Sequence, residues 1–246
     1  TTRMAFLPDL SARLATPEMM DDLSIVDERL AGALANLRWT NRLLGGYTAN
    51  DALLDPLLNV HPRLRVLDIG TGGGDYLAHL VQRGERSNCQ VEVVGVDNNP
   101  VTAAYARDWL DAHMPGHIRY RARIDEADAL DLPFSDNTFD VCMATLFLHH
   151  FHGDDAVRVL REMDRVSRLG VFVNDLHRHP LAYLGIEFLC RVLPVSPMYR
   201  NDAPLSVRRG FRRDELRTLT QQAGWKPPRI RWHWAFRYTA STLPLA

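Results

Sequence analysis

The sequence has 246 residues, of which 46% are hydrophobic and 24% are charged, values typical of a folded globular protein with a sizeable core. Its formal net charge of −1 gives no electrostatic reason to expect a nucleic-acid partner, and no run of about 18 apolar residues or signal peptide predicts a membrane or exported protein. The three cysteines have neither disulfide nor metal-site spacing, so we expect a protein of the reducing cytoplasm.

The first 60 residues are predicted to form a helical cap that precedes the first strand. Thr16-Pro17-Glu18 is typical of a helix start, and apolar side chains then recur every three or four positions. Gly45-Gly46 breaks this pattern, and a second helix is predicted over residues 48–58. The apolar positions of the first helix are Leu23, Val26, Leu30, Leu34 and Leu37.

The apolar stripe of this cap has two compatible interpretations. It packs against the core of the protein, or it forms a lid over a bound ligand. In the second interpretation, polar and aromatic residues near the end of the first helix face the ligand. These residues are Trp39, Asn41, Arg42 and Tyr47.

A glycine-rich turn lies between the first predicted strand and the next helix, within residues 65–80. The strand is a short apolar run, as expected of a parallel strand that is buried on both faces. Glycines follow at every second position, Asp75 stands where a helix N-cap belongs, and apolar residues then recur at helical spacing. Such a turn lets a ligand approach the backbone closely. The glycines are Gly70, Gly72 and Gly74.

The spacing of these glycines does not match a dinucleotide-binding turn. Those turns have the spacing G-x-G-x-x-G, whereas this chain has G-x-G-x-G, with Asp68 two positions before the first glycine and Thr71 after it. A carboxylate at Asp68 suits a ligand that has cationic ammonium and sulfonium groups but no pyrophosphate. The stretch resembles motif I of the class I S-adenosylmethionine-dependent methyltransferases. The resemblance implies that S-adenosylmethionine is the cofactor and that S-adenosylhomocysteine is its product.

An acidic residue ends the second predicted strand, over residues 91–97. Asp97 follows Gly72 by about the length of one helix and one strand. At this distance its carboxylate is expected to accept hydrogen bonds from both ribose hydroxyls of the cofactor. Asn98 lies beside it as a further cofactor contact, and Asn99-Pro100 begins the next predicted helix.

A third, more polar strand is predicted over residues 118–124, and the loop after it contains Asp128 and Ala129. This loop resembles the one that binds the adenine edge in the same superfamily. The resemblance implies that Asp128 accepts a hydrogen bond from the adenine amino group. It also implies that the backbone amide of Ala129 donates to a ring nitrogen.

Two further strands, over residues 139–144 and 170–175, complete an alternation of strands and helices. This alternation predicts an α/β fold with a Rossmann-like, doubly wound, mostly parallel sheet that has helices on both faces. Ligands of such sheets lie outside the carboxyl ends of the strands, where the glycine turn and Asp97 fall. Thr145 follows the fourth strand at the same edge, so we expect it to contact the cofactor as well.

The alternation is interrupted at about residues 176–209, which we interpret as an insertion after the fifth strand that encloses the substrate. Residues 206–211 are expected to lead into a polar helix, and a last strand is predicted over residues 229–238, where apolar and polar residues alternate. The predicted organisation is a helical cap or lid over residues 1–60 and a methyltransferase core with a lid insertion over residues 61–246.

Three histidines follow the fourth and fifth strands, on the side where the cofactor is expected. We expect one of them to be the general base that takes a proton from the methyl acceptor, because imidazole exchanges protons near neutral pH. His150 and His177 are the preferred candidates, and His149 is the third. Alternatively, these histidines only shape the pocket. No Asp or Glu accompanies them at a recognisable ligand spacing, so we expect no metal. The candidates for contact with the acceptor are Trp39, Arg42, Tyr47, Tyr183 and Tyr199.

The resemblance covers about residues 65–175 and implies an enzyme that holds a nucleophile in line with the methyl–sulfur bond. Residues 173–178 and 206–211 are similar to methyltransferases of polyketide-type secondary metabolism, which implies O-methylation of a phenol, enol or carboxylic acid. The alternatives are N- or C-methylation of a small molecule, and a cofactor-binding partner protein that transfers no methyl group. The expected partner is a small-molecule acceptor, not a nucleic acid or a membrane, and the chain is expected to be a monomer or homodimer.

Overall fold

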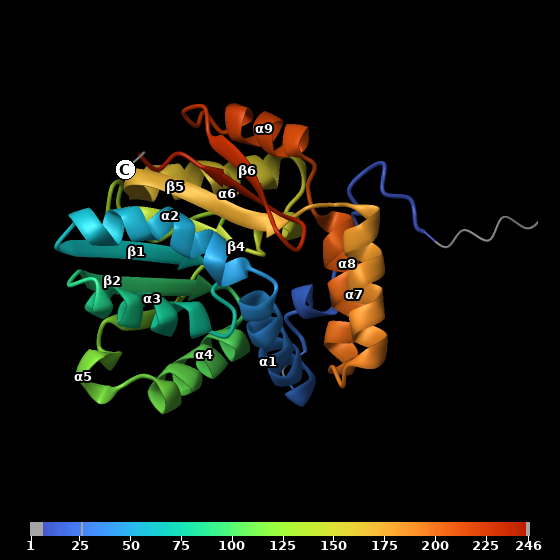
Figure 1. Ribbon diagram of the computed structural model, residues 1–246, viewed down its shortest axis with the longest axis horizontal. Coiled ribbons are helices and arrows are strands. Elements are labelled where there is room, and N and C mark those ends of the chain that lie inside the picture. The colour runs from blue at the N-terminus through green and yellow to red at the C-terminus, as the bar shows by residue number, and fades with distance from the viewer. Residues whose placement is uncertain (1–6, 26, 245–246) are drawn as a thin grey trace, which may run out of the picture.

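The computed structural model describes residues 7–25 and 27–244, which form a central sheet with helices on both faces (Figure 1). The strands are β1 (Arg63–Ile69), β2 (Gln90–Asp97), β3 (Ala122–Glu126), β4 (Phe139–Thr145), β5 (Ser167–Leu176), β6 (Arg229–His233) and β7 (Arg237–Ser241). Within the described residues they form a seven-stranded sheet of order β3-β2-β1-β4-β5-β7-β6. Strands β1 to β5 are parallel, and β7 is antiparallel to both of its neighbours. The prediction of a doubly wound, mostly parallel sheet is confirmed.

Helices cover both faces of the sheet and also extend beyond the carboxyl ends of its parallel strands. They are η1 (Met19–Asp21), α1 (Glu28–Leu43), α2 (Gly46–Val60), α3 (Asp75–Arg86), α4 (Pro100–His113), α5 (Gly116–Arg119), η2 (Leu148–His150), α6 (Gly153–Val166), α7 (Pro180–Val192), α8 (Pro197–Arg209) and α9 (Arg213–Gln222), where η marks a 3-10 turn. Within residues 7–25 and 27–244, none of these helices has the length and hydropathy that crossing a membrane requires.

Two apolar clusters cover the two faces of the sheet, because successive side chains of a strand point to opposite faces. Val66 of β1 belongs to the cluster formed with helices α2, α3 and α4. Its neighbour Leu67 belongs to the cluster formed with helices α6 and α9. Both side chains are fully buried, as expected of a central parallel strand. The loops between strands and helices therefore begin at strand ends that are anchored in a packed core.

A third apolar cluster lies beyond the carboxyl ends of the strands and forms the cap of the molecule. It joins α1 to the pair α7–α8, as Figure 1 shows to the right of the strand arrowheads. The predicted insertion after the fifth strand is this helix pair, and residues 206–209 belong to α8 rather than to a connecting loop. Helix α2 instead packs on the sheet through Leu54 and Leu57. The division of the chain into a cap and a core stays a prediction.

The first long helix begins later than the sequence pattern predicts. Asp27 caps α1 by accepting a hydrogen bond from the amide of Arg29, and this cap fixes the helix start. The predicted start at Glu18 is followed only by the short turn η1. Leu23 lies before the helix and is 49% exposed, so it is not part of the apolar stripe. Val26 lies outside the described residues.

Two predicted strands also differ from the structure. Ile118 belongs to the helical turn α5, which begins after Pro115, and β3 begins only at Ala122. Residues 229–238 are not one strand but the hairpin of β6 and β7. Its turn contains Ala235 and Phe236 with positive φ values of 60° and 57°, and this left-handed backbone reverses the chain within an otherwise alternating pattern.

Candidate active site

The glycine turn after β1 requires glycine at its alternate positions. Gly70, Gly72 and Gly74 have φ values of 67°, 54° and 72°, a conformation that strains any other L-residue. A Cβ atom on Gly70 would lie 2.0 Å from the ring of Phe147, whereas one on Gly72 would meet only Leu34, at 3.7 Å. The backbone of Gly72 is thus left open to a cavity, as close approach of a ligand requires.

The helix that follows this turn is capped by glycine and not by Asp75, contrary to the prediction. Gly74 is the N-cap of α3, and Asp75 is the first residue of the helix. The carboxyl group of Asp75 accepts a hydrogen bond from the hydroxyl of Tyr47. Gly74 itself packs against Ala106 of α4, where a Cβ would lie 3.2 Å from the alanine methyl. Gly74 therefore has a packing role and does not line a cavity.

Asp68 and Thr71 form a buried pair beneath the glycine turn. Asp68 is 4% exposed, and the hydroxyl of Thr71 donates to one of its oxygens at 3.0 Å. Burial raises the pKa of the Asp68 carboxyl to about 7, and Thr71 opposes this shift. The second oxygen of Asp68 has no hydrogen-bond partner among the described residues. Asp68 does not itself line a cavity, so its effect on a bound cation would act through the turn.

Asp97 ends β2 directly beside the glycine turn. Its carboxylate accepts hydrogen bonds from the amide of Gly72 at 3.3 Å and from the amide of Asn99 at 3.0 Å. Burial raises the pKa of the Asp97 carboxyl to about 6, against the lowering effect of these two amides. A half-buried carboxylate at a strand end is the group that the sequence predicts for a ribose.

A small pocket joins the residues that were predicted to hold the adenosine. It lies at the ends of β2 and β3, and Gly70 and Phe147 form its border with the rest of the site. Asp128 accepts a hydrogen bond from the amide of Leu130 at 2.9 Å, which fixes its loop. The structure thus brings the predicted adenosine contacts together, although their roles stay predictions. The predicted contacts in this pocket are Gly70, Asp97, Asn98, Asp128 and Ala129.

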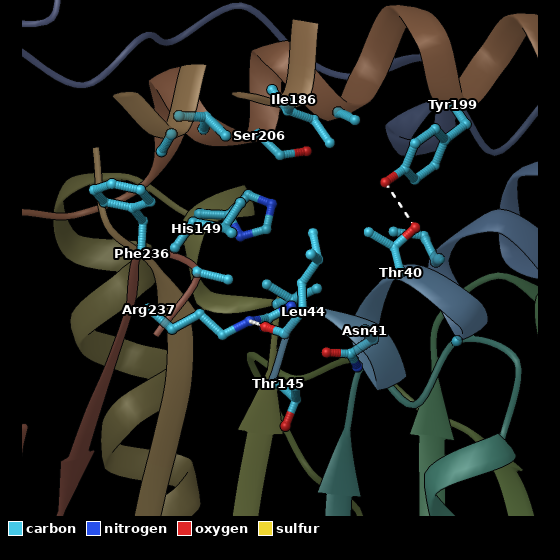
Figure 2. Close-up of a pocket in the computed structure, with 18 of the residues that line it drawn as sticks. Thr40, Asn41, Leu44, Thr145, His149, Ile186, Tyr199, Ser206, Phe236 and Arg237 are labelled. Carbon is cyan, nitrogen blue, oxygen red and sulfur yellow. Dashed lines mark hydrogen bonds between the residues drawn. The ribbon is translucent and has the colours of Figure 1, made fainter. Parts of the chain in front are cut away.

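A larger cavity of about 490 Å³ lies between the glycine turn and the cap (Figure 2). Residues 70–73 and Thr145 line one end of it, and α7, α8 and the turn between β6 and β7 line the other. Most of its lining is apolar, including Leu34, Ile186 and Phe236. Because Gly70 borders both this cavity and the small pocket, a ligand of the small pocket would reach the larger cavity across this residue.

Among the residues predicted to contact the acceptor, the structure places Tyr199 in this cavity, where its hydroxyl donates to Thr40 at 2.9 Å. The other four do not line the cavity, which corrects the prediction. Trp39 packs into the cap cluster and Arg42 is exposed. Tyr47 is buried against α3, and the hydroxyl of Tyr183 donates to Glu187 on its own helix. The sequence pattern identified their helices but not the side of each helix that faces the cavity.

His149 lies at the polar end of the cavity and is 2% exposed. Its Nδ1 donates to the buried carboxylate of Asp175 at 2.7 Å, and its Nε2 lies 3.4 Å from Oε1 of Glu18. Burial disfavours a charged imidazole, but the two carboxylates outweigh it and raise the pKa of His149 to about 9. Figure 2 shows its ring pointing into the cavity below Ser206 of α8. At neutral pH, His149 is therefore a cation and not a free base.

His150 borders the same cavity and is only partly buried. Its Nδ1 is 2.5 Å from a carboxylate oxygen of Asp21, whose other oxygen accepts from Arg209 at 2.5 Å. The two histidine rings lie side by side, with their centres 4.3 Å apart. His150 is thus held in one orientation by a carboxylate from the N-terminal segment.

The structure does not bring His177 to this group, which corrects its predicted position near the acceptor. The residue follows β5, but its ring packs against His179, Phe236 and Tyr238, and it does not line the cavity. Burial lowers the pKa of the His177 imidazole to about 4, and the neighbouring His179 and Arg178 act in the same direction. His177 is therefore neutral at physiological pH and separated from the cavity by aromatic side chains.

Arg237 is a buried cation in the cavity that the sequence analysis did not single out. Its Nε donates to the backbone oxygen of Leu44 at 3.1 Å, and its Nη1 has no partner among the described residues. Burial lowers the pKa of the Arg237 guanidinium to about 10, although Asp175 partly opposes this shift. An unpaired guanidinium nitrogen at 2% exposure has the properties of a binding group for an anion.

Three acidic residues of the site have no signal in the sequence pattern. Glu18 and Asp21 belong to a segment whose pattern indicates only a helix start, and Asp175 ends a predicted strand. Glu18 and Asp175 are both buried, and each faces His149. More than a hundred residues separate Glu18 from His149 in the chain, so no local spacing could have indicated this contact.

Comparisons with known proteins agree with this geometry. Residues 66–170 match a family model described as "Methyltransferase domain". The chain is 32% identical over 173 residues to a demethylmenaquinone methyltransferase of Roseiflexus castenholzii, which covers 65% of this chain and 67% of the relative. It is 30% identical over 167 residues to a ubiquinone biosynthesis O-methyltransferase of Pseudomonas aeruginosa, which covers 65% and 63%. A crystal structure of a SAM-dependent methyltransferase from Aquifex aeolicus has the same fold, with a TM-score of 0.56 and 16% identity over 78% of this chain and 87% of that chain.

Proposed function

Because the chain belongs to the S-adenosylmethionine-dependent methyltransferases, we propose that it transfers the methyl group to an oxygen of a lipophilic small molecule. The family makes the chain an enzyme and S-adenosylmethionine its methyl donor. The acceptor in this proposal is a phenol, an enol or a carboxylic acid. Three features of the site support it, namely the glycine turn beside Asp97, the apolar cavity, and the polar groups at one end of that cavity.

The cofactor fits the residues around the glycine turn. In this proposal the carboxylate of Asp97 binds the ribose hydroxyls, while Asp128 and the amide of Ala129 bind the adenine at the small pocket, which has a volume of about 10 Å³ and must widen to admit it. The ring of Phe147 lies against Gly70 and must turn aside for the sugar to pass between the two pockets. The methionine part then lies along residues 70–73, which places the sulfonium at the border of the larger cavity.

The single observation that carries the acceptor proposal is the composition of the larger cavity. Its apolar lining suits an aromatic ring with an alkyl or prenyl substituent, because burial of apolar surface provides most of the binding energy for such ligands. The polar groups within it include His149, His150 and Arg237. The guanidinium of Arg237 would stabilise the negative charge that an acceptor oxygen gains as it loses its proton.

The proposed reaction needs one proton transfer and one methyl transfer. His150 takes the acceptor proton, since His149 is already protonated at neutral pH. The acceptor oxygen then attacks the methyl carbon, so that an oxygen–carbon bond forms while the carbon–sulfur bond breaks and S-adenosylhomocysteine leaves. The cavity contributes to the rate by holding the oxygen in line with that bond.

Methylation of a ring carbon is the second candidate, because the names of the relatives include both kinds of reaction. One similar protein, of Idiomarina loihiensis, is named a ubiquinone/menaquinone biosynthesis C-methyltransferase, and another is named a ubiquinone biosynthesis O-methyltransferase. A phenolate is nucleophilic at oxygen and at the ring carbons beside it, and the same cavity suits both reactions. The polyketide-type acceptors and an N-methyl product stay predictions from the sequence.

Product analysis decides among these reactions. The enzyme is incubated with methyl-labelled S-adenosylmethionine and paired acceptors, namely a hydroquinone and a phenol, each with and without an alkyl chain. We expect label in an aryl ether and faster turnover of the alkylated compounds. Label on a ring carbon would establish the second candidate. Cofactor binding without turnover of any phenol, enol or acid would contradict the proposed acceptor class.

A further inference from the structure

Two histidines and one glutamate meet at the polar end of the cavity. One side-chain nitrogen or oxygen from each of Glu18, His149 and His150 lies within 4.8 Å of the others. Oε1 of Glu18 and Nε2 of His149 are 3.4 Å apart. This is about the separation of two ligands of a tetrahedral metal ion at bond lengths of about 2.0–2.1 Å.

Two of these atoms are buried without a partner. Neither Oε1 of Glu18 nor Nε2 of His149 has a hydrogen bond to any described residue, although both side chains are at least 97% buried. The neighbours of Oε1 are ion-pair partners beyond hydrogen-bond geometry, Nε2 of His149 at 3.4 Å and Nη1 of Arg209 at 3.7 Å, so its hydrogen-bonding capacity is unused. The other oxygen of Glu18 accepts from the hydroxyl of Ser206 at 2.8 Å, which directs Oε1 towards the histidine.

Carboxylates also orient both imidazole rings. Asp175 is hydrogen-bonded to Nδ1 of His149 at 2.7 Å. Asp21 is hydrogen-bonded to Nδ1 of His150 at 2.5 Å. The Nε2 atoms are therefore the nitrogens left for a further ligand. A carboxylate behind each metal-binding histidine is the usual arrangement in protein metal sites, because it fixes the ring and makes Nε2 more basic.

Two buried carboxylates, Glu18 and Asp175, face the same imidazole. Arg209 pairs with Asp21, and its Nη1 lies 3.7 Å from Oε1 of Glu18. The imidazole of His149 is the nearest cationic neighbour that the structure gives to both Glu18 and Asp175. A divalent ion that replaces the proton on His149 would compensate both carboxylates more fully.

We propose that Glu18, His149 and His150 bind a divalent transition-metal ion at the polar end of the acceptor cavity. Two imidazoles and one carboxylate are a ligand set suited to Zn²⁺, Fe²⁺ or Co²⁺, and three protein ligands leave a coordination position open to the cavity. The role of the ion rests on the proposed function. An ion held here would lower the pKa of an acceptor hydroxyl that occupied the open position, so that its proton could leave to solvent. His150 would then act as a metal ligand, and its role as the base applies to the protein without the ion.

The first test measures metal binding directly on the full chain after treatment with a chelator. Titration with Zn²⁺ against a chromophoric competitor should show one tight site per chain. Glu18→Gln and His149→Gln should each weaken the Zn²⁺ affinity by more than about 100-fold, and Asp21→Asn by about 10–100-fold. Glu18→Gln has nearly the same shape as the native residue, so it remains informative if His149→Gln does not fold.

The matched control is His117→Gln. His117 is an exposed histidine of α5, its Nε2 lies 3.7 Å from Glu85, and it does not line this cavity. It should leave the Zn²⁺ affinity unchanged. If the parent and Glu18→Gln bind Zn²⁺ equally, the cluster is only an imidazolium between two carboxylates and the proposal is wrong. The same samples are melted with S-adenosylhomocysteine. A parent protein that binds Zn²⁺ but shows no melting shift would contradict the proposed function and not the metal site.

Discussion

The carboxylate of Asp97 accepts a hydrogen bond from the amide of Gly72 at 3.3 Å, which joins the end of β2 to the glycine turn. This contact places a half-buried acid and an open backbone at the carboxyl ends of the strands. The pKa of that acid is raised to about 6 because burial disfavours its charged form. Its charge therefore changes within a pH range that an enzyme tolerates, and this makes the proposed ribose contact accessible to measurement.

Cofactor affinity should fall as the pH decreases through about 6. The ionised form of Asp97 accepts both ribose hydroxyls, whereas the protonated form loses an acceptor, so acid favours the form that binds less tightly. The dissociation constant of S-adenosylhomocysteine, measured by calorimetry between pH 5 and 8, should be flat above about pH 7 and rise by up to about tenfold per pH unit below 6.

Asp97→Asn is the control for this effect, because its amide does not titrate. The variant should bind the cofactor more weakly by about 1–3 kcal/mol and with a nearly flat pH dependence. Asp68 is another acid near the turn, and burial raises its pKa to about 7. If Asp97→Asn retained the full pH dependence, the titrating group would be Asp68 or another residue, and the ribose assignment would fail.

Gly72→Ala should separate ligand binding from folding. The positive φ of 54° costs an alanine about 1–2 kcal/mol, but its Cβ would meet only Leu34 in the cavity. The variant should fold with a modestly lower melting temperature and lose at least about tenfold in affinity for S-adenosylhomocysteine, because the methyl group occupies the place of the ligand. Gly116→Ala, where a Cβ has open space, should change neither quantity. An unchanged affinity in Gly72→Ala would remove this backbone from the cofactor site.

Arg237→Met should lower the activity towards the acceptor and leave the affinity for the cofactor unchanged. Arg237 lines the cavity, and its Nη1 has no hydrogen-bond partner among the residues that the structure describes. A charge-assisted hydrogen bond to an anionic oxygen contributes about 1.5–3 kcal/mol. We therefore expect kcat/KM for a phenol to fall about 10–100-fold while the dissociation constant of S-adenosylhomocysteine stays the same. Arg231→Met, on the exposed face of β6, is the matched control. Equal activity of Arg237→Met and the parent would exclude an anion-binding role.

The parts of the fold that depend on local sequence were predictable. The glycine turn, the acid at the end of β2 and the alternation of strands and helices follow from backbone conformation and from burial on both faces of the sheet. The hairpin of β6 and β7 was not predictable from alternation, because its turn uses Ala235 and Phe236 with positive φ instead of glycine. Tertiary packing overrode the local preference there.

The acceptor side of the site was less predictable, since it is assembled from distant segments. Glu18, His149 and Arg237 come from the N-terminal segment, from the loop after β4 and from the last strand. Each looks ordinary in its own sequence context, and only the fold reveals that they line one cavity. Which side of a helix faces the cavity also decides which side chains reach a ligand. The apolar stripe of α1 did not indicate that Trp39 and Arg42 lie on a side that does not line the cavity.

The last prediction tests which histidine acts on the acceptor proton. His150 lines the cavity beside His149, whereas His177 is separated from it by aromatic rings. His150→Ala should therefore lower kcat by about 10²–10⁴-fold with cofactor affinity intact, and His177→Ala should stay within a few-fold of the parent. A large loss in His177→Ala alone would contradict this assignment. If both variants kept the parental rate, the acceptor would arrive already ionised. A carboxylic acid is ionised at pH 7 and needs no base, so that result would direct the product search to methyl esters.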